Sequence, residues 1–325
     1  MLRTGLCELF GIEHPIIQAG MGPFGSGAEL AAAVSNAGAI GSLGGAARPI
    51  DELRQQLALL RDLTDRPFVM NFTYPWLQQN PEHFAAALEA RPPVISLALG
   101  DPGDLVKRAH DAGALFVQQV HTVEQAYLVA ERDVDVIIAQ GTEAGGFTGM
   151  VAMPVLVPQV ADAVSPIPVV AAGGIADGRG LAAALVLGAQ GANIGTRFLA
   201  SDEASIGDSW KKRIVEATSV DAVKAEVWDE IFPKPGAEAF DVVPRALRTQ
   251  FIDEWQDRRT EAAGEADRLQ GEIWSGIQQG RMEDFVPFTG QSAGLVHEIL
   301  PAGEIVDRLV QGAEDALRGA AALAA

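Results

Sequence analysis

The chain has 325 residues, 48% of them hydrophobic, which is enough for one large single-core domain or for a domain with an appended lobe. Asp and Glu number 43 against 24 Lys and Arg, and the net charge of -19 argues against nucleic acid or an anionic membrane as a partner. The single cysteine, Cys7, excludes an internal disulfide, and without a signal-peptide core or an apolar stretch of roughly 20 residues we expect a cytoplasmic protein that crosses no membrane.

Short apolar runs alternate with segments of helical period along roughly the first 200 residues, a pattern typical of parallel strands joined by helices. Within 50–63, for example, Leu53, Leu57 and Leu60 recur at helical spacing, which predicts a helix with one buried face. Eight apolar runs have the length and composition of buried strands. The predicted strands span residues 15–18, 39–42, 68–71, 94–98, 115–120, 136–140, 168–172 and 191–194.

Eight strand–helix units predict an α/β fold, a TIM (β/α)8 barrel, with an open doubly wound sheet as the alternative. After the eighth strand the alternation stops, and three segments of helical composition predict a mainly helical inserted lobe near the C-terminus, which we expect to cap the barrel mouth. These segments are 210–216, 246–257 and 265–279. A last helix over 304–317 should return to the barrel wall. We therefore expect a barrel formed by residues 1–201 and 286–325 and a lobe formed by residues 202–285.

The sixth predicted strand runs into a loop, 141–149, that contains four glycines. A connection that merely needs positive φ angles would explain one such loop, but three other strands also run into glycine, which favours a ligand lying against exposed backbone. Two of these turns, Gly173-Gly174 and Gly195-Thr196, follow the seventh and eighth strands, where TIM barrels commonly hold a phosphate by backbone N–H groups. The ligand is therefore expected to be phosphorylated.

Amide side chains stand at the ends of three predicted strands, namely Asn71, Gln119 and Gln140. Each amide offers both a donor and an acceptor, which suits the alternating edge of a heterocycle such as an isoalloxazine ring. The alternative for any one of them is a polar strand end that satisfies a neighbouring loop. Three amides at one rim of a barrel favour the ligand.

Several short segments carry a resemblance to a known family. They are His14-Pro-Ile-Ile-Gln-Ala-Gly-Met21, Asn71-Phe72, Gly141-Thr-Glu-Ala-Gly-Gly146, Ala171-Ala-Gly-Gly-Ile-Ala-Asp-Gly-Arg179 and Gly195-Thr-Arg-Phe198. On these segments the chain resembles the FMN-dependent nitronate monooxygenases, formerly called 2-nitropropane dioxygenases. The resemblance covers about 10–204 and continues more faintly over 290–294.

The resemblance implies a TIM barrel that holds one non-covalent FMN. By position, one glycine turn would pass beneath the flavin, the amides and the long glycine loop would lie near its ring or ribityl chain, and two turns would hold its phosphate. Ser292 would lie in the turn that returns from the lobe to the flavin and its substrate. The implied cofactor-binding residues are Gly20, Met21, Gly22, Asn71, Gln119, Gln140, Gly145, Gly146, Gly173, Gly174, Gly195 and Thr196.

One departure from the family concerns the catalytic base. The family's glycine loop usually ends in a histidine that takes a proton from the substrate, and here that position is Phe147, which has no titratable group. His121, close after Gln119, is a candidate replacement base at the rim, with a solvated loop residue as the alternative. Phe72 and Phe147 are expected to help form an apolar wall for the substrate, with core packing as the alternative.

Three hypotheses for function remain open at this point. The first is a flavoprotein monooxygenase that oxidises alkyl nitronates with O2; a nitronate is already deprotonated, so Phe147 does not exclude it. The second is an NAD(P)H-dependent FMN reductase of quinones or enoyl thioesters, in which the nicotinamide binds transiently because the chain lacks a Rossmann fingerprint. The third is a barrel that binds a phosphorylated metabolite without flavin. The scattered histidines indicate no metal site, and the sequence sets no oligomeric state.

Overall fold

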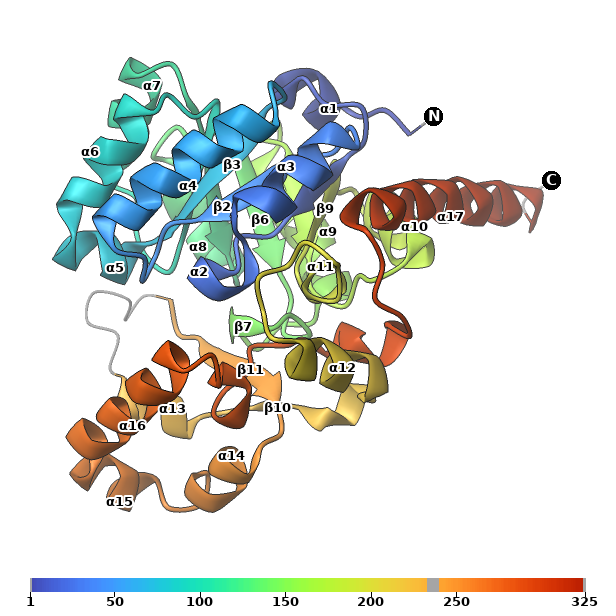
Figure 1. The fold of residues 1–325 in the computed structure, drawn as a ribbon. Coiled ribbons are helices and arrows are strands. Elements are labelled where there is room, and N and C mark those ends of the chain that lie inside the picture. The colour runs from blue at the N-terminus through green and yellow to red at the C-terminus, as the bar shows by residue number, and fades with distance from the viewer. Residues whose placement is uncertain (1, 233–239, 324–325) are drawn as a thin grey trace.

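A barrel of parallel strands surrounded by helices forms the centre of the molecule (Figure 1). The computed structural model describes residues 2–232 and 240–323. The barrel strands are almost wholly buried, as expected for aliphatic runs covered on both faces. They are β1 (Ile16–Gln18), β2 (Gly41–Gly44), β3 (Phe68–Thr73), β4 (Val94–Ala98), β5 (Leu115–Val120), β6 (Val136–Gln140), β8 (Val169–Ala172) and β9 (Gly191–Ile194).

The strand order is β1-β9-β8-β6-β5-β4-β3-β2, and the two ends of this sheet meet. A parallel bridge joins Ile17 to Ile40, and the backbone N–H of Gln18 donates to the carbonyl of Ile40 at 2.9 Å. The Gln18 side chain adds to the closure, because its Oε1 accepts the backbone N–H of Ser42 at 2.8 Å. The predicted TIM barrel is confirmed, each predicted strand overlaps one barrel strand, and the open-sheet alternative is wrong.

Helices cover the outside of the barrel. In the helix over 50–63 the predicted face, Leu53, Leu57 and Leu60, is buried in one apolar core with strand residues such as Phe68. The helices of the barrel region are α1 (Gly5–Phe10), α2 (Gly22–Gly25), α3 (Ala28–Asn36), α4 (Ile50–Leu63), α5 (Tyr74–Gln79), α6 (Pro81–Glu89), α7 (Leu105–Asp111), α8 (Val123–Ala130), α9 (Met153–Val164), α10 (Gly178–Val186), α11 (Thr196–Leu199) and α17 (Ala302–Leu323).

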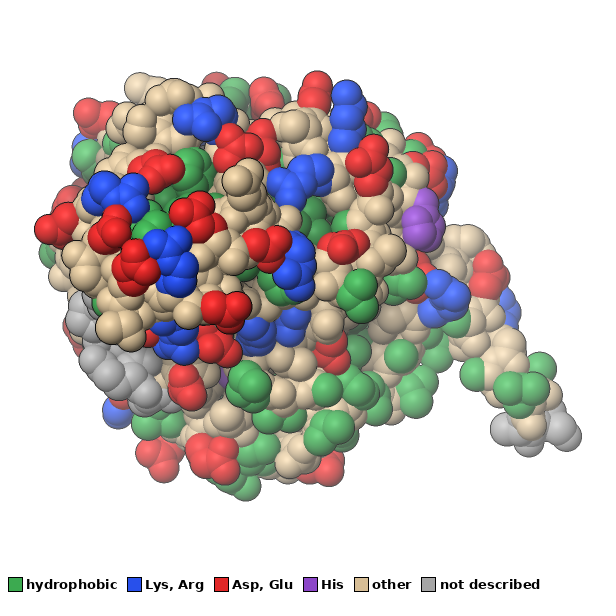
Figure 2. Space-filling model, turned by 90° about the horizontal axis from the view of Figure 1, so that it is seen from below, with side chains coloured by type: hydrophobic (Ala, Val, Ile, Leu, Met, Phe, Trp, Pro, Cys, Tyr) green, Lys and Arg blue, Asp and Glu red, His purple; other side chains and the backbone are tan. Residues whose placement is uncertain are grey.

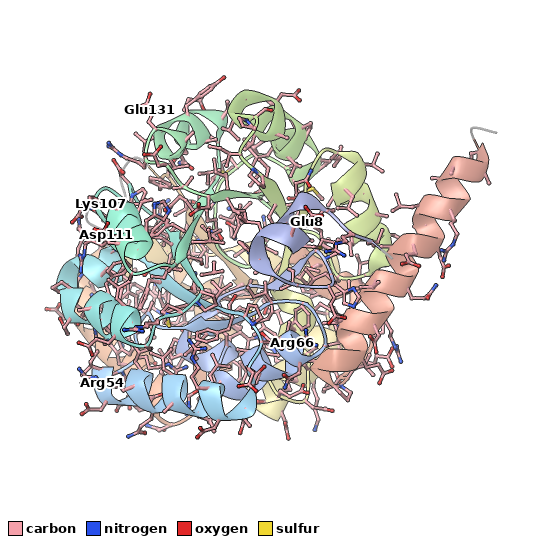
Figure 3. All side chains as sticks on the ribbon, turned by 90° about the horizontal axis from the view of Figure 1, so that it is seen from above. Glu8, Arg54, Arg66, Lys107, Asp111 and Glu131 are labelled. Carbon is pink, nitrogen blue, oxygen red and sulfur yellow. The ribbon has the colours of Figure 1, made fainter. Side chains whose placement is uncertain are left out.

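The amino-terminal end of the barrel is closed by α1. Its residues Leu6, Cys7 and Phe10 join one apolar cluster with the first residues of several strands, such as Val94 and Val136. Figure 3 looks onto this end and shows the helix that carries Glu8 lying across it. Because one end is filled in this way, a ligand can reach the strands only from their carboxyl ends.

The predicted final helix is present as α17 and packs against α10 on the barrel wall. The two helices approach closely at Gly178, where an added Cβ would lie 2.2 Å from the backbone nitrogen of Ala313. Only glycine fits at such a contact. Beyond this contact α17 runs away from the barrel toward the C-terminus (Figures 1 and 3).

A lobe follows the last barrel strand and has an apolar core of its own, which includes Trp255, Leu269 and Ile273. It is mainly helical, as predicted, but it also contains strands. Its elements are α12 (Asp208–Glu216), η1 (Ser219–Asp221), β10 (Ala222–Lys224), α13 (Val227–Ile231), β11 (Val243–Leu247), α14 (Gln250–Trp255), α15 (Arg259–Gly264), α16 (Ala266–Gln278) and η2 (Met282–Asp284), and η3 (Gln291–Leu295) leads back to the barrel.

A small antiparallel sheet joins the lobe to the barrel. Its order is β10-β11-β7, and β7 (Gly146–Thr148) is part of the long glycine loop. The helix predicted over 246–257 is wrong at its start, since Ala246 lies in β11 and the helix begins at Gln250. The reason is tertiary, because β11 pairs with β7, a segment about a hundred residues earlier in the chain.

The division of the chain into a barrel of residues 1–201 with 286–325 and a lobe of residues 202–285 stays a prediction. Residues 1, 233–239 and 324–325 of these ranges lie outside the described residues.

The outer face of the lobe carries many ion pairs between neighbouring helices and turns. Arg259 pairs with Glu226 at 2.9 Å and with Glu230 at 2.6 Å. Figure 2, seen from the lobe side, shows acidic and basic side chains intermixed on this face. Within the described part of the chain, no helix has both the length and the apolar character needed to span a bilayer.

Candidate active site

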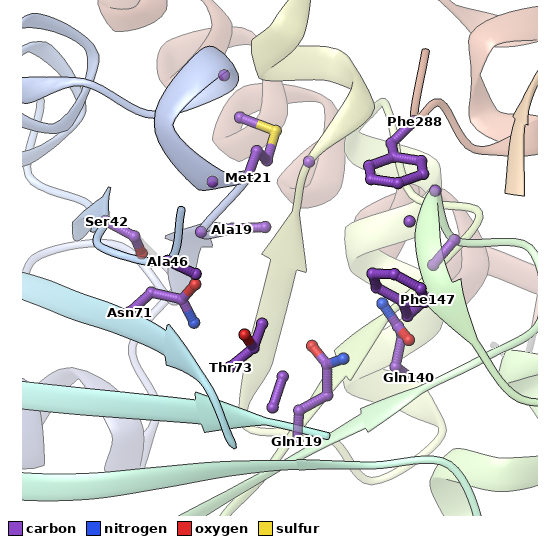
Figure 4. A pocket seen from close by; sticks show the side chains of 18 of the residues that line it. Ala19, Met21, Ser42, Ala46, Asn71, Thr73, Gln119, Gln140, Phe147 and Phe288 are labelled. Atoms are coloured by element: carbon purple, nitrogen blue, oxygen red, sulfur yellow. The ribbon is translucent and has the colours of Figure 1, made fainter. Parts of the chain in front are cut away.

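A cavity of about 430 Å³ lies at the carboxyl ends of the barrel strands, between the barrel and the lobe. Strand-end side chains form its floor, glycine turns form its sides, and apolar side chains of the lobe face it (Figure 4). The cavity therefore lies at the end of the barrel where TIM-barrel enzymes bind their ligands.

Every residue expected to bind the cofactor lines this one cavity. Of the residues expected to contact substrate, Phe147 and Ser292 line it as well. The cofactor set brought together in this way is Gly20, Met21, Gly22, Asn71, Gln119, Gln140, Gly145, Gly146, Gly173, Gly174, Gly195 and Thr196.

Two predicted residues do not reach the cavity. Phe72 is fully buried and packs on the ring of Phe84, with centroids 6.4 Å apart, so its expected role in substrate binding is wrong. It follows Asn71 in β3, and successive side chains of a strand point to opposite faces. His121 is also outside the lining of the cavity and is 1% exposed.

The burial of His121 argues against its expected role as a base at the rim. The loop after β7 covers it, since an added Cβ on Gly149 would lie 2.7 Å from the Cβ of His121. Burial lowers the pKa of His121 to about 4, a carbonyl of Gln140 acts in the opposite direction, and Lys224 lowers it further. The ring is therefore neutral at pH 7 and separated from the cavity.

The amide side chains sit in different hydrogen-bonding environments. Asn71 donates from Nδ2 to Ser96 Oγ at 2.7 Å, and the backbone of Gly20 passes so close that a Cβ there would lie 2.3 Å from Asn71 Oδ1. Gln140 is 8% exposed, and its Oε1 is buried with no hydrogen-bond partner among the residues described. Because a buried amide oxygen is costly to leave without a donor, Gln140 fits a ligand that presents an N–H group.

Two turns that follow β8 and β9 are suited to an anion. Gly173 and Gly174 adopt φ values of 101° and 72°, and successive backbone N–H groups in such turns form anion-binding concavities. Gly195 precedes α11, and Thr196 follows it with its Oγ1 accepting the N–H of Gly290 at 2.9 Å. The hydroxyl proton of Thr196 is thereby left to donate to a ligand. Arg197 serves the fold instead, since it donates to the carbonyl of Glu298 at 2.9 Å.

The long glycine loop is tied to the lobe and to the turn at 289–291. Arg245 in β11 donates from Nε to the carbonyl of Thr142 at 2.9 Å, and the N–H of Gln291 donates to the carbonyl of Glu143 at 2.9 Å. An added Cβ on Gly145 would lie 2.7 Å from the nitrogen of Gly290. The loop is therefore fixed in place by residues far away in the sequence.

No titratable side chain lines the cavity in the part of the chain that the structure describes. Its polar groups are amides, hydroxyls, indole N–H groups and backbone, and Phe147 stands in the wall next to Gly146. Sequence reasoning missed the aromatic residues that the lobe contributes, although the concentration of tryptophan in the lobe was a signal for them. These residues are Trp210, Trp228, Phe232, Trp274 and Phe288.

Residues 3–312 match the family model described as nitronate monooxygenase. The chain belongs to the nitronate monooxygenase family. A (3aS,4S,5R,7aS)-5-hydroxy-7a-methyl-1-oxo-octahydro-1H-indene-4-carboxyl-CoA dehydrogenase of Mycobacterium tuberculosis (strain ATCC 25618 / H37Rv) is 34% identical to this member, and the match covers 99% of both chains.

Two solved structures resemble this member of the nitronate monooxygenase family over nearly its whole length. FabK from Thermotoga maritima has a TM-score of 0.88 and 34% identity, covering 99% of this chain and 100% of that one. Nitroalkane oxidase from Streptomyces ansochromogenes has a TM-score of 0.84 and 28% identity, covering 97% of this chain and 99% of that one. Family and neighbours together make the chain an oxidoreductase, and the cofactor that the family implies is a flavin.

Proposed function

We propose that the cavity binds one FMN and that the protein oxidises alkyl nitronates with O2. The chemistry of the cavity supports this cofactor. The Oε1 of Gln140 needs a donor, and the edge of an isoalloxazine ring offers an N–H group between two carbonyls. The turns at Gly173-Gly174 and Gly195-Thr196 offer backbone and hydroxyl donors to a phosphate. When bound, FMN would supply electron transfer between the substrate and O2.

The residues of the chain would bind and orient both molecules. Asn71, Gln119 and Gln140 would hold the edge of the ring, and Thr196 would donate its hydroxyl proton to the phosphate. The lobe would exclude water from the reacting face, since its side chains on the cavity are mainly apolar.

The choice of a nitronate over a neutral nitroalkane rests on one observation. Among the described residues, no titratable side chain lines the cavity. A neutral nitroalkane must lose a proton before it is oxidised, and a positioned general base contributes about 10² to 10⁴-fold to such a step. A nitronate has already lost that proton. A cavity of amides and apolar walls suits the ionised substrate, whose charge the amide N–H groups would stabilise.

The test compares propane-2-nitronate with 2-nitropropane in the FMN-loaded protein under air. We expect kcat/KM to be at least about 10²-fold higher for the nitronate, because the described lining of the cavity offers no base to the neutral compound. Oxygen consumption measures both rates. Equal values for the two substrates would show that the protein supplies a base and would overturn this assignment.

A second candidate is an NAD(P)H-dependent flavin reductase of quinones or enoyl thioesters. It is favoured by the 34% identity over 99% of both chains with a relative named as a carboxyl-CoA dehydrogenase. Rapid anaerobic bleaching of the protein-bound flavin by NADH or NADPH would support this candidate, and unchanged absorption would reject it. A colourless protein that does not take up added FMN would instead support a barrel for another phosphorylated ligand.

A further inference from the structure

A row of aromatic side chains runs along the lobe side of the cavity, and we call it the aromatic ladder. The ring of Phe147 lies 5.6 Å from that of Phe288, which in turn lies 5.5 Å from Trp228. Trp228 stacks on Phe232 at 4.5 Å with an interplanar angle of 29°, and Phe232 meets Trp274 at 6.1 Å. All five residues line the cavity.

The ladder leads from the reacting end of the cavity to the surface. Phe147 lies in the glycine loop that follows β6, the strand that ends at Gln140, and both side chains line the cavity (Figure 4). Trp228, in the middle, is 8% exposed, whereas Trp274 at the far end is 43% exposed. The ladder is thus continuous with the proposed nitronate site and open at its outer end.

Packing within the lobe accounts for only part of the ladder. Trp228 belongs to the core of the lobe, and Phe147, Phe232 and Phe288 pack against that core from outside. These three rings are half-buried and the ring of Trp274 is exposed, so apolar surface of the ladder faces the cavity and the solvent. The side chains that extend this wall, Ile277 and Met282, are apolar as well. Connected apolar surface of this kind marks a place where an apolar ligand binds.

We propose that the substrate carries a flat, ring-bearing apolar body that lies along the aromatic ladder while its reacting group sits at the amide end of the cavity. Aromatic faces favour offset or edge contacts with another ring, and each buried methylene adds to affinity. This inference rests on the proposed function for the identity of the reacting group. The shape and polarity of the body follow from the ladder alone.

The test measures binding separately from turnover. Isothermal titration calorimetry of the FMN-loaded protein compares nitroethane with (2-nitroethyl)benzene, two neutral compounds that differ by one ring. We expect the phenyl compound to bind at least about tenfold more tightly, since burial of a ring is worth more than one factor of ten in affinity. Phe232→Ala and Trp274→Ala should remove most of this tenfold difference, because each variant removes one ring of the aromatic ladder.

Tyr127→Ala is the matched control, because Tyr127 is an aromatic residue of α8 that is 54% exposed and lies outside the lining of the cavity. It should keep the full difference. Circular dichroism and retained FMN absorption verify folding, and Phe232→Leu replaces Phe232→Ala if the latter does not fold, since leucine keeps the apolar volume without the ring. Equal affinity for the two compounds, or a difference that survives both ladder variants, overturns the inference.

The two proposals fail in different ways. A selective ladder in a protein that does not oxidise propane-2-nitronate would reject the nitronate reaction and support the ladder as a site for an apolar body. Rapid nitronate oxidation in a protein that binds both probes equally would support the nitronate reaction and reject the ladder as a binding site. The calorimetric measurement requires no turnover, so the two outcomes are read independently.

Discussion

At the scale of single residues, the alternation of side chains along β3 decides which of two neighbouring residues can contact a ligand. Asn71 and Phe72 are neighbours in β3, and only Asn71 lines the cavity. The period of two along a strand requires that result and excludes Phe72 once Asn71 is placed. No comparable rule existed for His121, because it follows the end of β5 and its burial depends on the loop around Gly149.

The resemblance places Phe147 where the family has a histidine, which leads to a prediction for Phe147→His. The variant should gain about 10²-fold in kcat/KM on 2-nitropropane, because it restores a titratable group at the cavity wall. The gain should increase with pH through about 6.5, since only the neutral imidazole accepts a proton. Steady-state oxygen consumption at several pH values measures it.

Phe147→Leu serves as the control, because leucine changes the ring without adding a base. It should show no gain on the nitroalkane. A gain of the same size in both variants would mean that the space next to Gly146, and not proton transfer, limits the kcat/KM of the wild-type protein on 2-nitropropane.

At the scale of elements, the eight barrel strands were predictable because each is a buried apolar run whose partners are its neighbours in the repeat. The strand β7 was not, since it consists of Gly146, Phe147 and Thr148 inside a glycine loop. Its strand character comes from β11, which pairs Pro244 with Phe147. The local sequence of β7 does not indicate that it pairs with a strand so far away in the chain.

The close contact between the glycine loop and the turn at 289–290 predicts the effect of Gly145→Ala. The new Cβ would lie 2.7 Å from the nitrogen of Gly290 and 2.8 Å from the carbonyl carbon of Thr289, and backbone atoms cannot rotate away. Displacing this turn would also break the bond from Gly290 to Thr196. We expect FMN affinity to fall at least about tenfold, the loss of roughly one hydrogen bond to a charged group. Fluorescence titration of the apoprotein with FMN measures it.

Gly271→Ala is the matched control, because Gly271 lies inside α16 with nothing within 4 Å of an added Cβ. Its FMN affinity should equal that of the wild type, and its free energy of unfolding should increase by about 1 kcal/mol through helix propensity. If Gly145→Ala bound FMN as tightly as Gly271→Ala, the glycine loop would not form part of the cofactor site.

At the scale of the whole molecule, His121 links stability to pH. Burial lowers its pKa from the ordinary 6.5 to about 4, with the Gln140 carbonyl opposing and Lys224 adding to the shift. The unfolded chain therefore binds a proton between these two values that the folded protein does not bind. Above pH 6.5 neither state binds this proton, so the folded protein keeps its full stability. As the pH falls below 6.5 the unfolded chain binds the proton, and the free energy of unfolding has decreased by about 3 kcal/mol at pH 4. Urea unfolding at pH 7.5 and at pH 4 measures the difference.

Replacing the imidazole of His121 separates its effect on the pH dependence of unfolding from the effects of the many carboxylates. His121→Phe cannot titrate, so its free energy of unfolding should fall by about 3 kcal/mol less between the two pH values than that of the wild type. His110→Phe is the control, since His110 lies on the surface beside Asp135. An identical pH dependence in His121→Phe and the wild type would mean that the folded protein accepts this proton.

Short apolar runs, together with glycine and amide residues at strand ends, were enough to predict the barrel, the rim residues and the family resemblance. The folded chain was needed to show that His121 is buried, that β7 pairs with a strand of the lobe, and that the aromatic ladder lines the same cavity as Gln140. Each of these depends on contacts between segments far apart in the chain. The periodicity of a segment shows which of its faces is buried. It does not show which distant segment packs on that face, because that contact forms only when the lobe packs against the barrel.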